Sequence, residues 1–328
     1  MIRQPKRKDA RVIITCIMLW LGALLMVWVN NLLAKRITAW ILVPSQQPPV
    51  LVVTPSPTFN AEWEISRFLR LTGYKPPTAK EISPALRQGL LEQYNTIIDV
   101  GTFDCLDYTV PGFQAGYTVY SFELDPDNQA RCLKTLLLLG ITSPETGLTI
   151  IEVNPGEAPL KIENPKQPHI YFYKAGVSNK KGGVSVSDAK EMAYAKGNGQ
   201  LPVVPLDEVI PMNASVFILK SDTQGHEYGV LEGAKHILQR GVGLLFIEFW
   251  PIGAENNGFK PDEALGLVYS LGYQCFDSGF HDYNSIHRPS NLNDYINQMI
   301  EEKTTKDIIG SWDDLVCVRM RKELGIAV

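Results

Sequence analysis

At residues 97–102 the chain reads IIDVGT, an apolar run that ends in a carboxylate and a glycine. Such a run, bounded by a turn residue, predicts a buried β-strand at Thr96–Val100. In a doubly wound α/β sheet the ligand binds beyond the carboxyl ends of the strands, so we expect Asp99 and Gly101 to face a ligand cleft. Glycine allows the backbone to approach a ligand closely, although an ordinary strand-to-loop turn has the same sequence.

A second apolar run ends in a carboxylate in the same way. Residues 119–122 read VYSF and precede Glu123, which follows the carboxylate of the first run by 24 positions. An acidic residue about 20 positions beyond the glycine turn can bind both ribose hydroxyls of a nucleoside. Glu123 is therefore predicted to hold a nucleoside cofactor, with a solvated strand end as the alternative. Its neighbour Leu124 and the turn residues Thr102 and Phe103 are predicted to line the same pocket.

Residues 217–228 read FILKSDTQGHEY, a third apolar run that ends in charged residues. Lys220 and Asp222 alternate with Ser221, so their side chains are expected to point the same way. Two charges at a buried strand end are costly unless they are solvated, paired or functional. We therefore name Lys220, Asp222 and His226 as candidate catalytic residues. Asp222 or His226 is the expected proton acceptor, although a histidine at a helix start can simply cap or pack.

Short apolar runs alternate with helical patterns after Thr96, which predicts a mostly parallel sheet covered by helices on both faces. Further strands are expected at Tyr117–Phe122, Ile170–Tyr173, Val216–Leu219 and Leu244–Phe249, with helices at Gln129–Leu139, Glu227–Gln239 and Asp262–Ser270. The stretches Gln274–Phe276 and Leu315–Met320 are expected to form a late hairpin that gives an antiparallel edge.

Two more segments carry weaker patterns. Between Glu62 and Tyr94, two apolar stripes at helical spacing predict helices that pack on the sheet edge or cover the cleft. The glycine-rich stretch Lys180–Gly199 is expected to be a mobile surface loop that, with Gly253–Lys260, governs the choice of substrate.

Six runs of the sequence, in this order, resemble the FkbM family of S-adenosylmethionine-dependent methyltransferases: IIDVGTFDCLDYT, VYSFELDPDN, KAGVSNKKGGVSV, LPVVPLDEV, VFILKSDTQGHEYGVLEGAKHIL and LLFIEF. They cover most of Thr96–Phe249. The resemblance implies a class I methyltransferase fold, which is Rossmann-like, and S-adenosyl-L-methionine as cofactor. It also implies O-methylation of a hydroxyl on a sugar-containing or other natural-product acceptor.

The resemblance also implies roles for single residues. Asp99 and Gly101 would line the methionine end of the cofactor, Glu123 its ribose and Ala175 its adenine, and Asp222 would sit where the methyl group meets the acceptor. The family's first motif usually reads DVGANxG, whereas Cys105 stands here at the place of the second glycine. Either its Cβ narrows the pocket, or the loop is rebuilt around Phe103 and Asp104.

Composition restricts the partners and the bound metals. The 328 residues carry a formal net charge of −4 and lack a dense basic cluster after position 36, so nucleic acid is not expected as a partner. The five cysteines form no CxxC pair, so they are expected to be mostly buried thiols, with one disulfide possible. His281, Asp282 and His287 lie in a loop-like stretch, and no metal site is expected there.

The N-terminal region predicts a membrane anchor. Residues 12–34 are uncharged and long enough to cross a bilayer, with a cleaved signal peptide as the main alternative. Five Lys and Arg residues precede this segment and two follow it closely, which predicts a type II orientation with the catalytic domain in the lumen of the secretory pathway or the periplasm. The expected organisation is a basic tail at 1–11, the anchor at 12–34, a proline-rich stem at 35–58, a helical lead-in at 59–95 and a methyltransferase domain at 96–328.

Three functions agree with these patterns. The first is a membrane-anchored O-methyltransferase that acts on a glycan or another small-molecule hydroxyl of the secretory pathway. The second is a catalytically inactive membrane-anchored binding protein with the same fold, in which the altered glycine loop no longer serves a cofactor. The third is an enzyme of nucleotide-sugars or dinucleotides, because a ribose-binding carboxylate alone does not distinguish these cofactors.

Overall fold

The computed structural model describes residues 61–71, 84–163, 165–186, 195–277, 292–301 and 312–319. The predicted tail, anchor and stem lie outside these residues, as do His281, Asp282 and His287. Within the described ranges, the helices are too short or too polar to span a bilayer.

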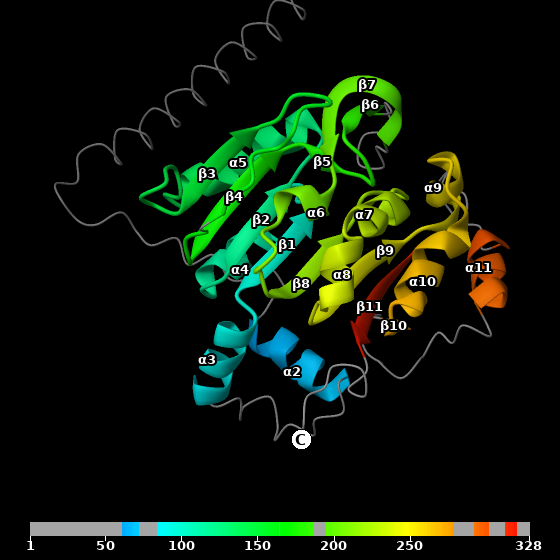
Figure 1. Cartoon of the computed structure of the whole chain (residues 1–328), viewed down its shortest axis with the longest axis horizontal. Helices are drawn as coiled ribbons and strands as arrows, with labels where there is room; N and C mark the ends of the chain where they lie inside the picture. Colours follow the sequence, from blue (N-terminus) through cyan, green and yellow to red (C-terminus); the bar gives the residue numbers. More distant parts are fainter. Residues whose placement is uncertain are drawn as a thin grey trace, which may run out of the picture. The chain divides into compact units, whose positions relative to one another are not determined.

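Eight strands form the main sheet: β1 (Thr96–Val100), β2 (Thr118–Phe122), β3 (Leu148–Glu152), β4 (His169–Lys174), β8 (Val216–Ser221), β9 (Leu244–Phe249), β10 (Tyr273–Asp277) and β11 (Asp313–Arg319). Their order is β10-β11-β9-β8-β1-β2-β4-β3 (Figure 1). Strand β11 runs antiparallel to both of its neighbours, and the other neighbouring pairs are parallel. The predicted doubly wound, mostly parallel α/β sheet is confirmed.

Helices cover both faces of this sheet because alternate strand residues point to opposite sides. On one face, Ile97 and Val119 pack with apolar residues of α2 (Ala61–Leu71), α4 (Thr109–Gln114) and α5 (Pro126–Leu138). On the other face, Ile98 and Tyr120 pack with residues of α7 (Glu227–Gly233), α8 (Lys235–Arg240) and α10 (Pro261–Ser270). Two apolar layers therefore hold the strand ends in fixed positions.

The two helices predicted before the first strand are α2 and α3 (Pro84–Gln93). The α2 stripe of Ile65, Phe68 and Leu69 is buried, and the Phe68 ring lies 5.6 Å from that of Tyr94 and 5.8 Å from that of Phe217 on β8. Helix α2 therefore packs on the face of a central strand, near the start of that strand, and not on the sheet edge.

A second sheet includes both ends of the loop expected at Lys180–Gly199, while residues 187–194 lie outside the described part of the chain. It contains β5 (Gly176–Val177), β6 (Gly182–Val186) and β7 (Ala195–Val204), in the order β5-β7-β6. The expectation of a loop was wrong for β6 and the first part of β7 because the glycines serve strand pairing. A Cβ on Gly183 would collide with the backbone of Gly199, so two residues without side chains allow the strands to approach there.

The C-terminal half differs from the expectation in two details. The helix predicted at Glu227–Gln239 is two helices, α7 and α8, with Ala234 between them at φ −110°. The late antiparallel pair is confirmed, but β11 lies between β9 and β10, so β10 forms the edge.

Several elements along the chain were not foreseen: β3, α4, α6 (Leu206–Val209), α9 (Pro251–Asn256) and α11 (Leu292–Glu301).

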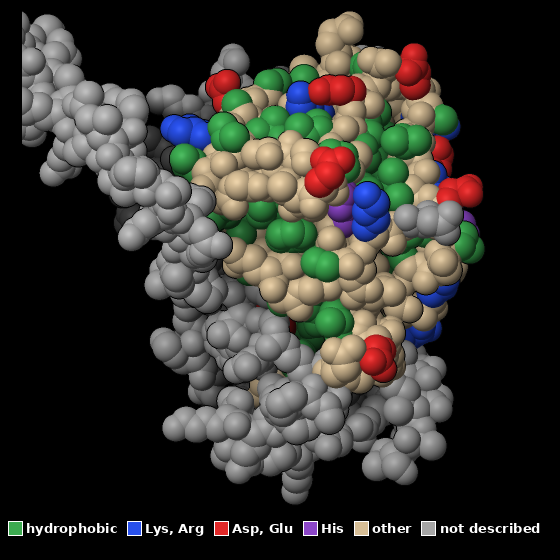
Figure 2. Space-filling view, turned by 90° about the vertical axis from the view of Figure 1, so that its left-hand side faces the viewer, with side chains coloured by type: hydrophobic (Ala, Val, Ile, Leu, Met, Phe, Trp, Pro, Cys, Tyr) green, Lys and Arg blue, Asp and Glu red, His purple; other side chains and the backbone are tan. Residues whose placement is uncertain are grey.

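The side of the molecule that is on the left in Figure 1, where β3 lies, carries a mixed surface. Figure 2 shows hydrophobic side chains there among polar and charged ones. Ile150 on β3 and Leu137 and Leu138 at the end of α5 are exposed hydrophobic residues of the domain.

Candidate functional site

A cavity of about 490 Å³ lies at the carboxyl ends of β1, β2 and β8. The chain winds from β1 toward β2 on one side, and β8 lies on the other side of β1, so this is the switch point at which open α/β sheets bind ligands. Seven of the predicted site residues line it: Gly101, Phe103, Glu123, Leu124, Lys220, Asp222 and His226.

The other three predicted residues do not line the cavity. Asp99, Thr102 and Ala175 are buried behind its wall. Gly176 and Val177 line it next to Ala175.

Lys220 is the centre of the charged part of the site. Its Nζ donates to the carbonyl oxygen of Gly101 at 3.0 Å and lies 3.3 Å from Asp222 Oδ2 and 3.7 Å from Asp99 Oδ1. Burial alone would lower the pKa of Lys220, but the two carboxylates outweigh it and raise that pKa above its ordinary value. Lys220 is therefore a fixed cation that links the ends of β1 and β8.

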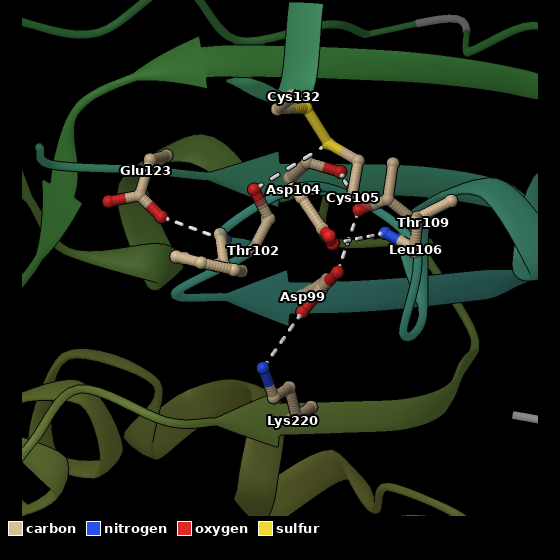
Figure 3. Close-up of a disulfide and its surroundings, with 11 residues drawn as sticks. Asp99, Thr102, Asp104, Cys105, Leu106, Thr109, Glu123, Cys132 and Lys220 are labelled. Atoms are coloured by element: carbon tan, nitrogen blue, oxygen red, sulfur yellow. Dashed lines mark hydrogen bonds and ion pairs between the residues drawn. A yellow bond between two sulfur atoms is a disulfide. The ribbon is translucent and has the colours of Figure 1, made fainter. Parts of the chain in front are cut away.

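Asp99 supports this cation from behind the cavity. Its Oδ2 accepts a hydrogen bond of 2.7 Å from the Thr109 hydroxyl, and its side chain faces Lys220 (Figure 3). Burial raises the pKa of Asp99, while Lys220 and the Thr109 hydrogen bond oppose that rise. Asp99 therefore reaches the ligand site only through Lys220.

Glu123 is held at the end of β2 by two backbone amides. Its Oε2 accepts from Phe103 N and its Oε1 from Asp125 N, each at 2.9 Å. Burial raises the pKa of Glu123 to about 7, and these two hydrogen bonds act against that rise. Each carboxylate oxygen has a second lone pair, so Glu123 can still accept a hydrogen bond from a ligand hydroxyl.

The glycine turn serves the packing of two strands. Gly101 has φ +78°, and a Cβ there would collide with the backbone carbonyl oxygen of Asp222. The sequence predicted glycine for close approach to a ligand, whereas the structure shows close approach to the chain that follows β8. Cys105 has φ +67°, so it keeps the left-handed conformation that glycine favours, at the place of the expected second glycine.

Cys105 forms a disulfide with Cys132 on α5 (Figure 3). Its side chain is fully buried and does not line the cavity, so Cys105 does not narrow the cavity. Arg131, next to Cys132, places its guanidinium 5.4 Å from the centre of the Phe103 ring. Of the two predicted alternatives, the structure therefore has the rebuilt loop, and the disulfide ties this loop to α5.

A second disulfide joins Cys275 and Cys317 on the paired strands β10 and β11. The expectation of mostly unpaired thiols was wrong, because the wide spacing in sequence did not show which cysteines meet in the fold.

Asp222 and His226 lie on the loop between β8 and α7. Burial opposes the charge of Asp222, but Lys220 and hydrogen bonds from neighbouring side chains hold its pKa below the ordinary value. Burial lowers the pKa of His226 to about 4, and its Nε2 lies 3.0 Å from the Ser178 hydroxyl. At neutral pH Asp222 is therefore ionised and the imidazole of His226 is neutral.

Comparison with protein families identifies the chain. A family model described as the methyltransferase FkbM domain matches residues 99–275, which is more than half of the sequence. This chain belongs to the FkbM methyltransferase family. The predicted resemblance is confirmed.

Solved structures provide further similarities. An FkbM methyltransferase from Methylobacillus flagellatus KT aligns with a TM-score of 0.37 and 13% identity over 69% of this chain, which spans 43% of that protein. A precorrin-6y C5,15-methyltransferase from Geobacter metallireducens GS-15 aligns with a TM-score of 0.31 and 8% identity, over 76% of this chain and 97% of the other. No curated protein matches the sequence.

The site of this FkbM-family chain contains residues that the sequence analysis missed. Gln224 and Asp107 line the cavity, and Glu248 near the end of β9 hydrogen-bonds to Gln224. Glu248 carried the signal used for Asp99 and Glu123, a carboxylate near the end of an apolar strand. Gln224 has φ +54°, which its sequence does not indicate.

Proposed function

We propose that this chain is an S-adenosyl-L-methionine-dependent methyltransferase that methylates a hydroxyl of a glycan or another small-molecule acceptor. Its FkbM family supports the reaction class. The proposal rests on one observation: β2 and β8 bring Glu123, Lys220 and Asp222 to the same cavity.

The residues present fit this cofactor. A volume of about 490 Å³ falls within the usual range for small-molecule sites, roughly 300–1,000 Å³. Glu123 offers carboxylate lone pairs for ribose hydroxyls, and Leu124, Val177 and Val203 provide apolar wall for a base. The Asp222 carboxylate, whose side chain is 35% exposed, offers a negative charge to a sulfonium.

When bound, the cofactor would supply the electrophilic methyl group, and the protein's task is to align the acceptor and take up its proton. Lys220 holds Asp222 in place. We propose that Asp222 or His226 would take up the proton that the acceptor hydroxyl loses on methylation, since Asp222 is ionised and His226 is neutral at neutral pH.

Calorimetric titration of the full-length chain tests the cofactor. S-adenosylmethionine and its demethylated product, S-adenosylhomocysteine, should both bind, whereas NAD should not. The variant Glu123→Ala should weaken binding about 10- to 150-fold, because hydrogen bonds to a charged group contribute about 1.5–3 kcal/mol. Glu157→Ala removes an exposed carboxylate outside the cavity and serves as the matched control. Binding of NAD alone, or of none of the three, would refute the proposal.

We also propose that a helix at residues 12–34 anchors the protein in a type II orientation, with the domain in the secretory lumen or periplasm. The charge asymmetry of the N-terminal region supports this. Two disulfides within the domain also support it, because disulfides persist in oxidising compartments. Asn213-Ala214-Ser215 is a sequence that accepts N-linked glycans in the secretory lumen, and Asn213 is exposed, which agrees with this placement. Protease treatment of sealed membranes should leave the domain intact until detergent is added, and digestion without detergent would overturn this placement.

A further inference from the structure

Glu248 is part of an acidic group at the edge of the cavity. It lies on β9, beside the loop that carries Asp222 and Gln224. The Gln224 side-chain amide donates to Glu248 Oε2 at 2.7 Å and to Asp222 Oδ1 at 3.0 Å. An amide group has two hydrogens, so one glutamine serves both carboxyl groups at once.

Acidic side chains surround Glu248 on each neighbouring element. Asp222 faces it from the loop after β8, Glu227 from α7, and Asp314 from the opposite position on β11. The ammonium group of Lys220 lies beside Oδ2 of Asp222 and also contacts Asp99. The ionisation of one of two neighbouring carboxyl groups opposes the ionisation of the other, which favours a proton on one of the pair.

The surroundings decide which of the two keeps it. Burial and the charge of Asp222 raise the pKa of Glu248 to about 10, while Lys220 keeps the pKa of Asp222 low. We therefore infer that the proton of the pair stays on Glu248, while the Gln224 amide binds both carboxyl groups.

The result is a carboxylate fixed from both sides. Asp222 Oδ1 accepts from Gln224, and Asp222 Oδ2 faces Lys220. Gln224 is held at φ +54°, and its carbonyl oxygen accepts from the Asn257 amide at 3.3 Å. A non-glycine residue persists in that conformation only where its surroundings hold it, as at functional sites.

We propose that Glu248 is a positioning residue, a neutral acid that, together with Gln224, fixes the ionised Asp222 carboxylate toward the cavity. The inference deepens the proposed methyl transfer and rests on it for its catalytic meaning. The proposal gives Glu248 no contact of its own with the substrate.

Infrared spectroscopy of the full-length protein tests the protonation. At about pH 8.5, Glu123 and Glu227, with pKa values of about 7, are largely ionised, whereas Glu248 keeps its proton. The wild-type spectrum should contain a protonated-carboxyl band that Glu248→Gln removes. Glu255→Gln, at an exposed position on α9, should leave the band unchanged. As the pH is raised, the band of Asp222→Asn should disappear at a lower pH than the band of wild type, because the charge that keeps the proton on Glu248 is gone.

Titration with S-adenosylmethionine tests the positioning. Glu248→Gln imitates the neutral acid and should bind within about threefold of wild type, whereas Glu248→Ala should bind about tenfold more weakly. Circular dichroism of each variant verifies its fold, and the glutamine variant keeps the test valid if the alanine variant does not fold.

Two results would overturn the inference: no band that depends on Glu248, or wild-type affinity in a folded Glu248→Ala variant. Strongly weakened binding in Glu248→Gln would show that the charge is required, which also contradicts it. Failure of the wild type to bind S-adenosylmethionine or its product would instead refute the proposed function, and with it the catalytic meaning of Glu248. The infrared band would still show whether the acid is neutral.

Discussion

Replacing Gly101 by alanine should destabilise the protein more than the same change at a glycine with a similar φ angle. Gly101 has φ +78°, and a Cβ there collides with the backbone carbonyl oxygen of Asp222. Gly140 has φ +74°, and a Cβ there meets no atom within 4 Å. Gly140→Ala should therefore be destabilised only by the cost of the left-handed conformation for alanine, about 1–2 kcal/mol. Gly101→Ala adds overpacking of about 1–3 kcal/mol, which gives about 2–5 kcal/mol in all.

Urea denaturation of the full-length variants measures both values, with the slopes compared so that the two unfolding reactions are known to be alike. The displaced Asp222 carbonyl should also disturb the cavity, so Gly101→Ala should lose affinity for S-adenosylmethionine and Gly140→Ala should not. Equal losses of stability at the two glycines would refute the reasoning, because the shared backbone conformation would then account for the whole effect.

Three further predictions concern the cross-link and the charges. Replacing Cys105 and Cys132 together by serine opens a loop with a sequence separation of 27, so the free energy of unfolding should fall by about 3–4 kcal/mol, measured by urea titration against oxidised wild type. Lys220→Met leaves Asp99 buried without its cation, which should lower the free energy of unfolding by about 3–5 kcal/mol at pH 7. That loss should shrink in urea titrations at lower pH, as Asp99 becomes protonated. His226 should stay neutral in the folded protein until the pH approaches about 4, whereas the unfolded chain protonates it at the ordinary histidine pKa, so the free energy of unfolding should fall as the pH drops from that value toward 4. An imidazole NMR signal that titrates near the ordinary value would contradict this.

The strands that position the site could be predicted from the sequence because they are buried on both faces. Thr96–Val100 and Leu244–Phe249 are mostly apolar runs, and both have the bounds expected from the sequence. The carboxylate at a strand end located Glu123 because parallel strands end at one edge of the sheet. The alternation of Lys220 and Asp222 correctly placed both side chains on one side.

The sequence could not show contacts that depend on how distant segments pack. Cys105 and Cys132 lie 27 positions apart and meet only because α5 runs back along the sheet. The glycines at 183 and 199 indicated a loop, because their role in close strand pairing appears only once both strands are placed. Asp99 was expected to line the cavity, yet its side chain is fully buried behind the cavity wall, where it faces Lys220.

The polar row of Asp99, Lys220, Asp222, Gln224 and Glu248 crosses the ends of three neighbouring strands. Burying ions costs several kcal/mol for each, so a row of this kind is weak support for stability and needs another explanation. It contains three carboxyl groups and one ammonium, and a proton on Glu248 relieves part of that excess. Under the proposed function, the sulfonium of the cofactor would bring a second positive charge beside Asp222. The row would then distinguish the charged methyl donor from the neutral product, which the nucleoside contacts of Glu123 cannot do.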